Sequence, residues 1–150
     1  MTEAKTPTKP ANVWSDEERA AMQASARERR GSRRNPADER AEGESAFRES
    51  MARMPDKDRV VAERIDAIVM AAVPELARKT YYGMPAYAQD GNVIFWIKNA
   101  GKFKMRYDTL EFSDKAHLDD GAVWPVSFAV KEMTAAAESR IVSIVKQAAG

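Results

Sequence analysis

The sequence predicts an α+β fold in two layers, with an antiparallel sheet of about four to five strands packed against helices. Two observations carry this prediction. Apolar residues recur at helical spacing before residue 74 and again after Thr134. Between these regions, residues 80–130 contain short apolar or alternating runs separated by Gly and Asp turns. Connections this short join antiparallel strands, because parallel neighbours need long crossovers.

Composition divides the chain into three parts. Residues 1–13 are rich in Thr, Pro and Lys and predict a flexible tail. Residues 14–55 predict a charged helical extension that buries little area. Residues 56–150 predict the α+β domain itself, since they contain nearly all of the regular apolar patterns.

The extension predicts two helices. Ser15 and Glu18 form a capping box for the first, and Gly31 ends it. Asn35 caps the second, Pro36 occupies its first position, and Gly43 is a weak point inside it. Only the second half of that helix is expected to dock firmly, through Phe47, Met51 and Met54.

Arginines gather at the end of the first predicted helix, which admits a nucleic-acid interpretation. The simpler interpretation is that they balance the helix dipole on a solvated surface, and nearby acidic residues favour it. The arginines are Arg27, Arg29, Arg30, Arg33 and Arg34.

The domain begins with the clearest helix pattern, from Asp56 to just before Pro74. A first strand at 80–87 is interrupted by Gly and Pro, so we expect it at a sheet edge or with a bulge. Asp90 and Gly91 predict a hairpin turn into an apolar strand at 93–97.

Residues 102–107 alternate cleanly, which predicts a strand with Lys102, Lys104 and Arg106 on one face. A short capped helical turn is expected at 113–118, and a further strand at 123–130. Thr134 caps a last helix that reaches nearly to the end of the chain.

The run Tyr82-Gly83-Met84-Pro85-Ala86-Tyr87, with a preceding helix and following strands, resembles the YdhG-like family, a bacterial domain of unknown function. The resemblance covers roughly residues 59–150 and implies a small α+β domain. Some members of the family are described as frataxin-like iron chaperones, so the resemblance implies weak iron binding. Many relatives have Lys-x-His where this chain has Lys102-Phe103-Lys104, and that difference argues against a simple transfer of the iron role.

The metal candidates lie in the acidic segment that contains the one histidine of the chain. Carboxylate oxygens with an imidazole suit a divalent metal such as iron. The alternative, which we favour, is that these residues only cap a helix and form turns. The candidates are Asp114, His117, Asp119 and Asp120.

The ligand candidates combine the basic strand face with nearby apolar side chains, which suits an anionic ligand. The alternative is a solvated outer face on which lysines discourage aggregation. The candidates are Tyr82, Met84, Trp96, Lys102, Lys104 and Arg106.

The most favoured function is therefore a small-ligand or iron-binding carrier, and the alternative is a non-catalytic module that binds a protein or nucleic acid. No catalytic motif is present, so we do not expect an enzyme. A net charge of +1 argues against a nucleic-acid partner. The absence of cysteine and of a secretory signal indicates the cytoplasm and no membrane. A homo-oligomer or a protein partner on the N-terminal helices stays open.

Overall fold

The computed structural model describes residues 14–31 and 35–150, and the predicted tail at 1–13 lies outside them. Within these residues the strands form one antiparallel sheet and follow each other across it in chain order. This confirms the predicted α+β class and the antiparallel arrangement of the sheet. The strands are β1 (Ala77–Tyr81), β2 (Met84–Gln89), β3 (Asn92–Lys98), β4 (Asp108–Phe112) and β5 (Ser127–Val130).

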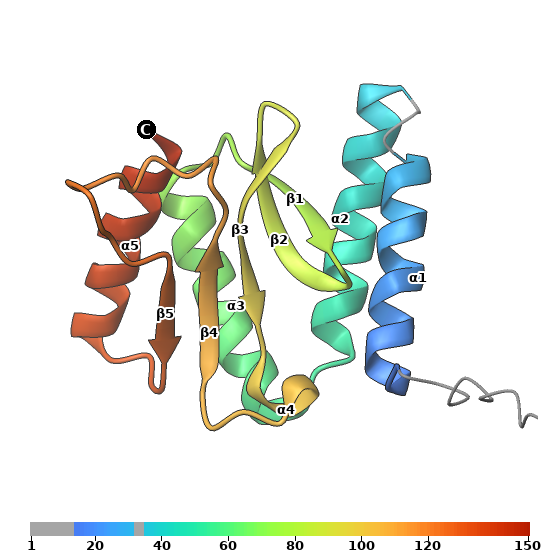
Figure 1. Cartoon of the computed structure of the whole chain (residues 1–150), viewed down its shortest axis with the longest axis horizontal. Helices are drawn as coiled ribbons and strands as arrows, with labels where there is room; N and C mark the ends of the chain where they lie inside the picture. Colours follow the sequence, from blue (N-terminus) through green and yellow to red (C-terminus); the bar gives the residue numbers. More distant parts are fainter. Residues whose placement is uncertain (1–13, 32–34) are drawn as a thin grey trace, which may run out of the picture.

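The helices form a layer behind the sheet and a pair beside it (Figure 1). α3 and α5 lie behind the strands, whereas α1 and α2 run along the side of β1. None of the helices in the described part of the chain is long and apolar enough to cross a membrane. The helices are α1 (Asp16–Gly31), α2 (Pro36–Ala52), α3 (Asp56–Ala72), the short α4 (Ala100–Phe103) and α5 (Ala135–Ala149).

The predicted first strand is in fact a hairpin of two strands, β1 and β2. Tyr82 and Gly83 form its turn, with φ angles of 49° and 79°, and two consecutive positive φ angles match the twist of a hairpin. Of the two expected alternatives for the Gly-Pro segment, the edge does not apply to β2, which lies between β1 and β3. The bulge is confirmed, because the register of β2 against β3 shifts between Tyr87 and Ala88. Pro85 is tolerated there because the pairing of β2 with β3 begins one residue later, at Ala86 and Trp96.

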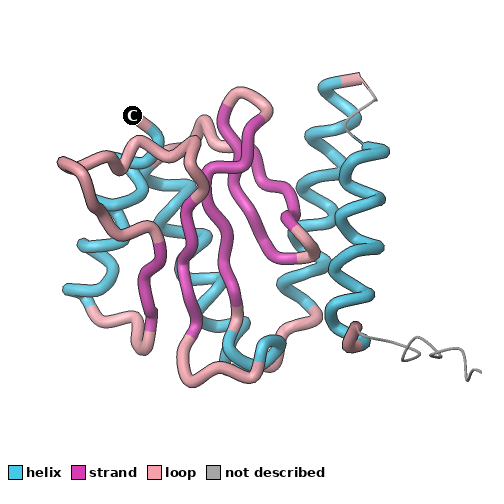
Figure 2. Tube along the Cα trace, in the orientation of Figure 1, coloured by secondary structure: helices cyan, strands magenta, loops and turns pink. Residues whose placement is uncertain are grey.

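The predicted strand at 102–107 was also wrong. Residues 100–103 form the helical turn α4, Lys104 ends it with φ of 53°, and β4 begins only at Asp108. Figure 2 shows this connection between β3 and β4 as helix and loop. The alternating pattern was misleading because buried carboxylates bind the backbone N–H groups of this segment, as described below.

The C-terminal part follows the sequence more closely. Residues 113–118 form turns instead of a helical turn, and β5 is shorter than the strand expected at 123–130. Thr134 caps α5 as predicted, because its hydroxyl accepts a 3.1 Å hydrogen bond from the Ala137 N–H.

A row of aromatic rings runs through the core from α2 to β5. Phe47 meets Tyr87 edge to face, Tyr87 stacks on Phe95, and Phe95 stacks on Phe112, with ring centroids 5.4, 4.6 and 5.1 Å apart. Phe128 completes the row at 5.7 Å from Phe112. Because Phe47 is almost fully buried, α2 shares this core, and the expectation that its second half would dock is confirmed.

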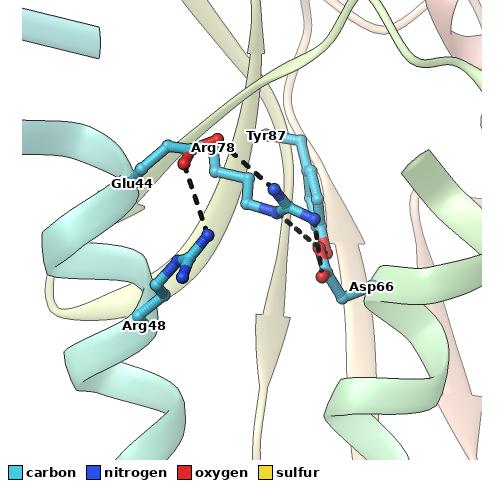
Figure 3. A network of polar contacts seen from close by, with 5 residues as sticks. All are labelled: Glu44, Arg48, Asp66, Arg78 and Tyr87. Carbon is cyan, nitrogen blue, oxygen red and sulfur yellow. Dashed lines mark hydrogen bonds and ion pairs between the residues drawn. The ribbon is translucent and has the colours of Figure 1, made fainter. Parts of the chain in front are cut away.

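A polar network joins α2, α3 and the sheet beside this row (Figure 3). The Arg78 guanidinium donates two 2.9 Å hydrogen bonds to Asp66, and its Nη1 lies 3.3 Å from a carboxylate oxygen of Glu44. The Tyr87 hydroxyl donates a 2.9 Å hydrogen bond to the same Asp66 carboxylate. Burial, and then the charge of Asp66, raise the pKa of Tyr87 well above its ordinary value.

Gly43 allows α2 to lie directly against β1, so it is a contact point of the helix and not merely a weak position. A Cβ atom at Gly43 would lie 2.6 Å from the backbone oxygen of Arg78. In the β1–β2 ladder Arg78 pairs with Tyr87, at a position whose backbone groups point away from β2. α2 therefore covers the outer edge of β1, which would otherwise be open to pairing with another strand.

Candidate ligand-binding site

The candidate site lies on the face of the sheet turned away from α3 and α5. Phe95 belongs to the core row, so its neighbour Trp96 points to the opposite, outer face. There the ring centroids of Trp96 and Tyr81 are 4.5 Å apart. The Tyr82 ring meets the Tyr81 ring edge to face, with centroids 4.7 Å apart. Three rings of β1, its turn and β3 therefore form a continuous aromatic surface, of which Tyr82 is 42% exposed.

Glu111 of β4 fixes the Trp96 ring. Trp96 Nε1 donates a 3.0 Å hydrogen bond to Glu111, and Lys98 Nζ lies 3.9 Å from the same carboxylate. Lys98 pairs in register with Thr109, which is buried and whose hydroxyl has no hydrogen-bond partner among the described residues. The outer face thus combines aromatic rings with several polar groups.

The α4 turn brings a second lysine and a fourth ring to this face. Lys98 Nζ and Lys102 Nζ lie 4.9 and 5.3 Å from the centroid of the Phe103 ring, within the range of cation–π attraction. Lys102 Nζ also lies 3.3 Å from where a Cβ of Gly83 would stand. We call Tyr81, Tyr82, Trp96, Lys98, Lys102, Phe103 and Glu111 the aromatic–lysine cluster.

Two acidic residues hold α4 in place. Asp58 at the start of α3 accepts hydrogen bonds from the Gly101 N–H at 2.8 Å and from the Asn99 side chain at 3.0 Å. Asp108 accepts a 2.7 Å hydrogen bond from the Ala100 N–H, and burial raises the pKa of Asp108. Since Asp58 is itself buried, the position of the Lys102 backbone is determined by the core domain.

Lys102 is the least compensated charge of the cluster. Within the described residues, no carboxylate forms an ion pair with it, and burial, followed by the nearby charge of Arg53, lowers the pKa of its ammonium group. The charges of Glu17 and Glu28 on α1 act in the opposite direction. A negatively charged group placed here would therefore be stabilised.

The structure brings three of the six predicted ligand residues into the cluster and places a fourth next to it. Tyr82, Trp96 and Lys102 belong to the cluster, and Met84 is buried directly after the turn, paired with Tyr81. The other two lie elsewhere, because the predicted strand does not exist. Lys104 is exposed at the end of α4, and the Arg106 guanidinium lies 5.6 Å from the Tyr107 ring centroid.

The predicted metal residues are not assembled into a metal site. No three histidine or carboxylate side chains of the described residues gather closely enough to hold a metal ion. The His117 ring lies against Gly150, and its backbone N–H donates a 2.9 Å hydrogen bond to Ala148. Asp114, Asp119 and Asp120 are exposed in the loop between β4 and β5 and do not converge on one point, so this donor set does not fit iron.

Sequence reasoning did not select Tyr81, Lys98 or Phe103 as site residues. Lys98 lies two residues after Trp96 in the same strand, so period-two alternation places both on one face. Lys98 could therefore have been selected from the sequence as a neighbour of Trp96. The predicted strand placed Phe103 on the face opposite Lys102, whereas in the helical turn α4 its ring lies beside the ammonium groups of Lys98 and Lys102.

A groove of about 890 Å³ opens next to the cluster, between the α1–α2 pair and β1. Its lining includes Thr80 and Gly83 of the hairpin and Glu28 of α1. Glu28 Oε1 accepts two hydrogen bonds, one from the Thr80 hydroxyl at 2.5 Å and one from the Gly83 N–H at 3.4 Å. The groove and the cluster therefore meet at the Tyr82-Gly83 turn.

We compared the chain with models of protein families, with curated proteins and with solved structures, and none of these comparisons found a match. The resemblance to the YdhG-like family accordingly stays a prediction from the central motif.

Proposed function

We propose that this protein binds a small anionic ligand that carries an aromatic ring, at the aromatic–lysine cluster. The observation that supports the proposal is the half-buried Lys102 ammonium, which has no ion-pair partner among the described residues and lies 5.3 Å from the Phe103 ring centroid. A half-buried ammonium without an ion-pair partner has lost part of its hydration, so a ligand that supplies a negative charge there is stabilised.

The aromatic rings of the cluster are the reason to propose that the ligand also carries a planar ring. The ring centroids of Tyr81 and Trp96 are 4.5 Å apart, and the hydrogen bond from Trp96 to Glu111 limits rotation of the indole. An ordered aromatic surface binds a planar group at little cost in side-chain entropy. The neighbouring ammonium groups then orient the negative end of the ligand.

The iron-carrier role implied by the resemblance is the other version of a carrier function. It rests on the resemblance alone, since the histidine and acidic residues expected to bind iron are dispersed among the described residues. Titration with ferrous iron, followed by calorimetry, tests that version directly. We therefore base the proposal on the cluster.

A titration with three matched probes tests the proposal. Benzoate, benzyl alcohol and benzylamine share a ring but carry negative, zero and positive charge. We expect benzoate to shift the Trp96 indole N–H signal in NMR spectra in a saturable manner, and the other two probes to bind far more weakly. Comparison with Trp96→Phe identifies the signal among those of the other tryptophans.

Substitution of two lysines provides the control. Lys102→Met keeps an unbranched side chain only one atom shorter and removes the charge, and it should weaken benzoate binding about tenfold, as expected for one charge-assisted contact. Lys104→Met removes the same charge from an exposed position outside the cluster and should leave binding unchanged. Equal binding of benzoate and benzyl alcohol, or equal effects of the two substitutions, would contradict the proposal.

A further inference from the structure

The carboxylate of Glu28 is bound as a ligand carboxylate would be. Its Oε1 accepts hydrogen bonds from the Thr80 hydroxyl at 2.5 Å and from the Gly83 N–H at 3.4 Å. Thr80 is only 6% exposed, so its hydroxyl is a buried donor. Lys102 Nζ lies 3.3 Å from where a Cβ of Gly83 would stand, and the charge of Glu28 acts on the Lys102 ammonium without an ion pair between them. A buried hydroxyl and a backbone N–H therefore bind one carboxylate, and an ammonium group lies near the same turn.

The backbone at Gly83 suits this role. Its φ of 79° belongs to the left-handed region, which glycine adopts without strain. The closest atoms to a Cβ at this position would be Lys102 Nζ at 3.3 Å and the Ala24 side chain at 3.6 Å. The missing side chain lets the ammonium group and α1 approach the turn together. We call Thr80, Gly83 and Lys102 the carboxylate cradle.

α1, which supplies Glu28, is weakly held. It is the outermost helix beside the sheet (Figure 1), and none of its side chains that the structure describes is fully buried. The side chains on its inner face are mostly small, such as Ala24 and Ser25, so little apolar area holds the helix in place. A helix attached in this way is displaced at a low cost in free energy.

We propose that the carboxylate cradle is the part of the site that binds the negative end of the ligand, and that Glu28 fills it as an internal, displaceable substitute. This inference rests on the proposed function and adds the identity of the anionic group, a carboxylate. Binding of the ligand then requires Glu28 to leave. The apparent affinity of the wild-type protein is reduced by the fraction of molecules in which the cradle is filled.

Removal of Glu28 tests this competition. Glu28→Ala empties the cradle, and Glu28→Gln keeps the shape of the side chain without its charge. Both should bind benzoate at least tenfold more tightly than the wild-type protein, with the larger gain for alanine. Glu132→Gln, which removes the same charge at the far edge of the sheet, should bind benzoate with wild-type affinity.

Hydrogen exchange of the α1 backbone provides a second, independent measurement. Saturation of the wild-type protein with benzoate should speed exchange in residues 16–28, because displacement of Glu28 loosens the helix. If benzoate speeds exchange in α1 but Glu28→Ala binds benzoate no more tightly, the proposed competition is wrong. It is equally wrong if Glu28→Ala binds more tightly but exchange in α1 does not change.

The two proposals fail in different ways. If benzoate binds with the expected dependence on Lys102 but the Glu28 variants bind no more tightly, the internal-ligand inference is wrong and the proposed function stands. If benzoate binds neither the wild-type protein nor Glu28→Ala, the cradle is not a carboxylate site and both proposals are overturned.

Discussion

The Tyr87 hydroxyl donates a 2.9 Å hydrogen bond to the Asp66 carboxylate, and the Tyr87 side chain is fully buried in the core. The same carboxylate receives two hydrogen bonds from Arg78. One acidic side chain of α3 thus satisfies a buried hydroxyl of β2 and a cation of β1. Because buried polar groups must be paired, this contact fixes the helix against the hairpin.

Replacement of Tyr87 by phenylalanine should lower the free energy of unfolding by about 1 kcal/mol, the usual net value of a hydrogen bond. The pH dependence should change as well. The folded-state pKa of Tyr87 is raised, so its stabilising contribution is complete below the unfolded pKa of about 10 and is lost as pH rises above it. Urea unfolding at neutral and alkaline pH should show a smaller alkaline loss for Tyr87→Phe than for the wild-type protein. An equal loss in both proteins would show that Tyr87 is not the responsible group.

Gly43→Ala should destabilise the protein, although alanine is the better helix former. The new Cβ would lie 2.6 Å from the Arg78 backbone oxygen, so α2 must move away from β1. We expect a loss of about 1–3 kcal/mol in thermal or urea unfolding, as for other overpacked sites. Ser45→Ala, at an exposed position of the same helix, is the matched control and should be neutral or slightly stabilising. A stabilising effect of Gly43→Ala would contradict the close contact.

Asp58→Ala should cost about 2–3 kcal/mol, because it leaves the Gly101 N–H and the buried Asn99 amide without their acceptor. It should also weaken benzoate binding, since α4 would no longer hold Lys102 in place. Asp56→Ala removes an exposed acid from the same first turn of α3 and should have a much smaller effect on both measurements. Loss of stability with unchanged benzoate affinity would separate the anchoring of α4 from the binding site.

Benzoate binding should weaken as pH rises through the pKa of Lys102. That pKa is lowered in the folded protein, so the ammonium group loses its proton at a pH below the ordinary lysine value of 10.5. The protonated form binds the anion, and affinity therefore falls across that window. Titrations at constant ionic strength should show the fall in the wild-type protein and in Lys104→Met, but a much smaller one in Lys102→Met. Parallel curves in all of these proteins would assign the effect to another group.

The sequence predicted correctly the elements that depend on local residue patterns. It predicted wrongly the segment whose conformation depends on contacts with residues far away in the chain. The helix pattern of α3, the Asp90-Gly91 turn and the Thr134 cap are local, and they are present as expected. The segment around Lys102 alternates like a strand, but Asp58, more than forty residues earlier, binds its backbone in a helical turn. Local alternation contains no information on that contact.

The candidate site shows the same limit. Tyr82 and Trp96 could be selected because they lie in the central motif and its strand. Glu28 could not, since its hydrogen bonds with Thr80 and Gly83 depend on how α1 packs against the β1–β2 hairpin. A carboxylate on a charged surface helix looks like any other in the sequence.

The close contact of Gly43 with β1 has a consequence for assembly. α2 closes one edge of the sheet, and within the described residues β5 has no strand on its other side. Copies that paired through strand edges would each have a single edge to offer. Such pairing ends at two molecules, so the folded protein cannot extend its sheet into a filament.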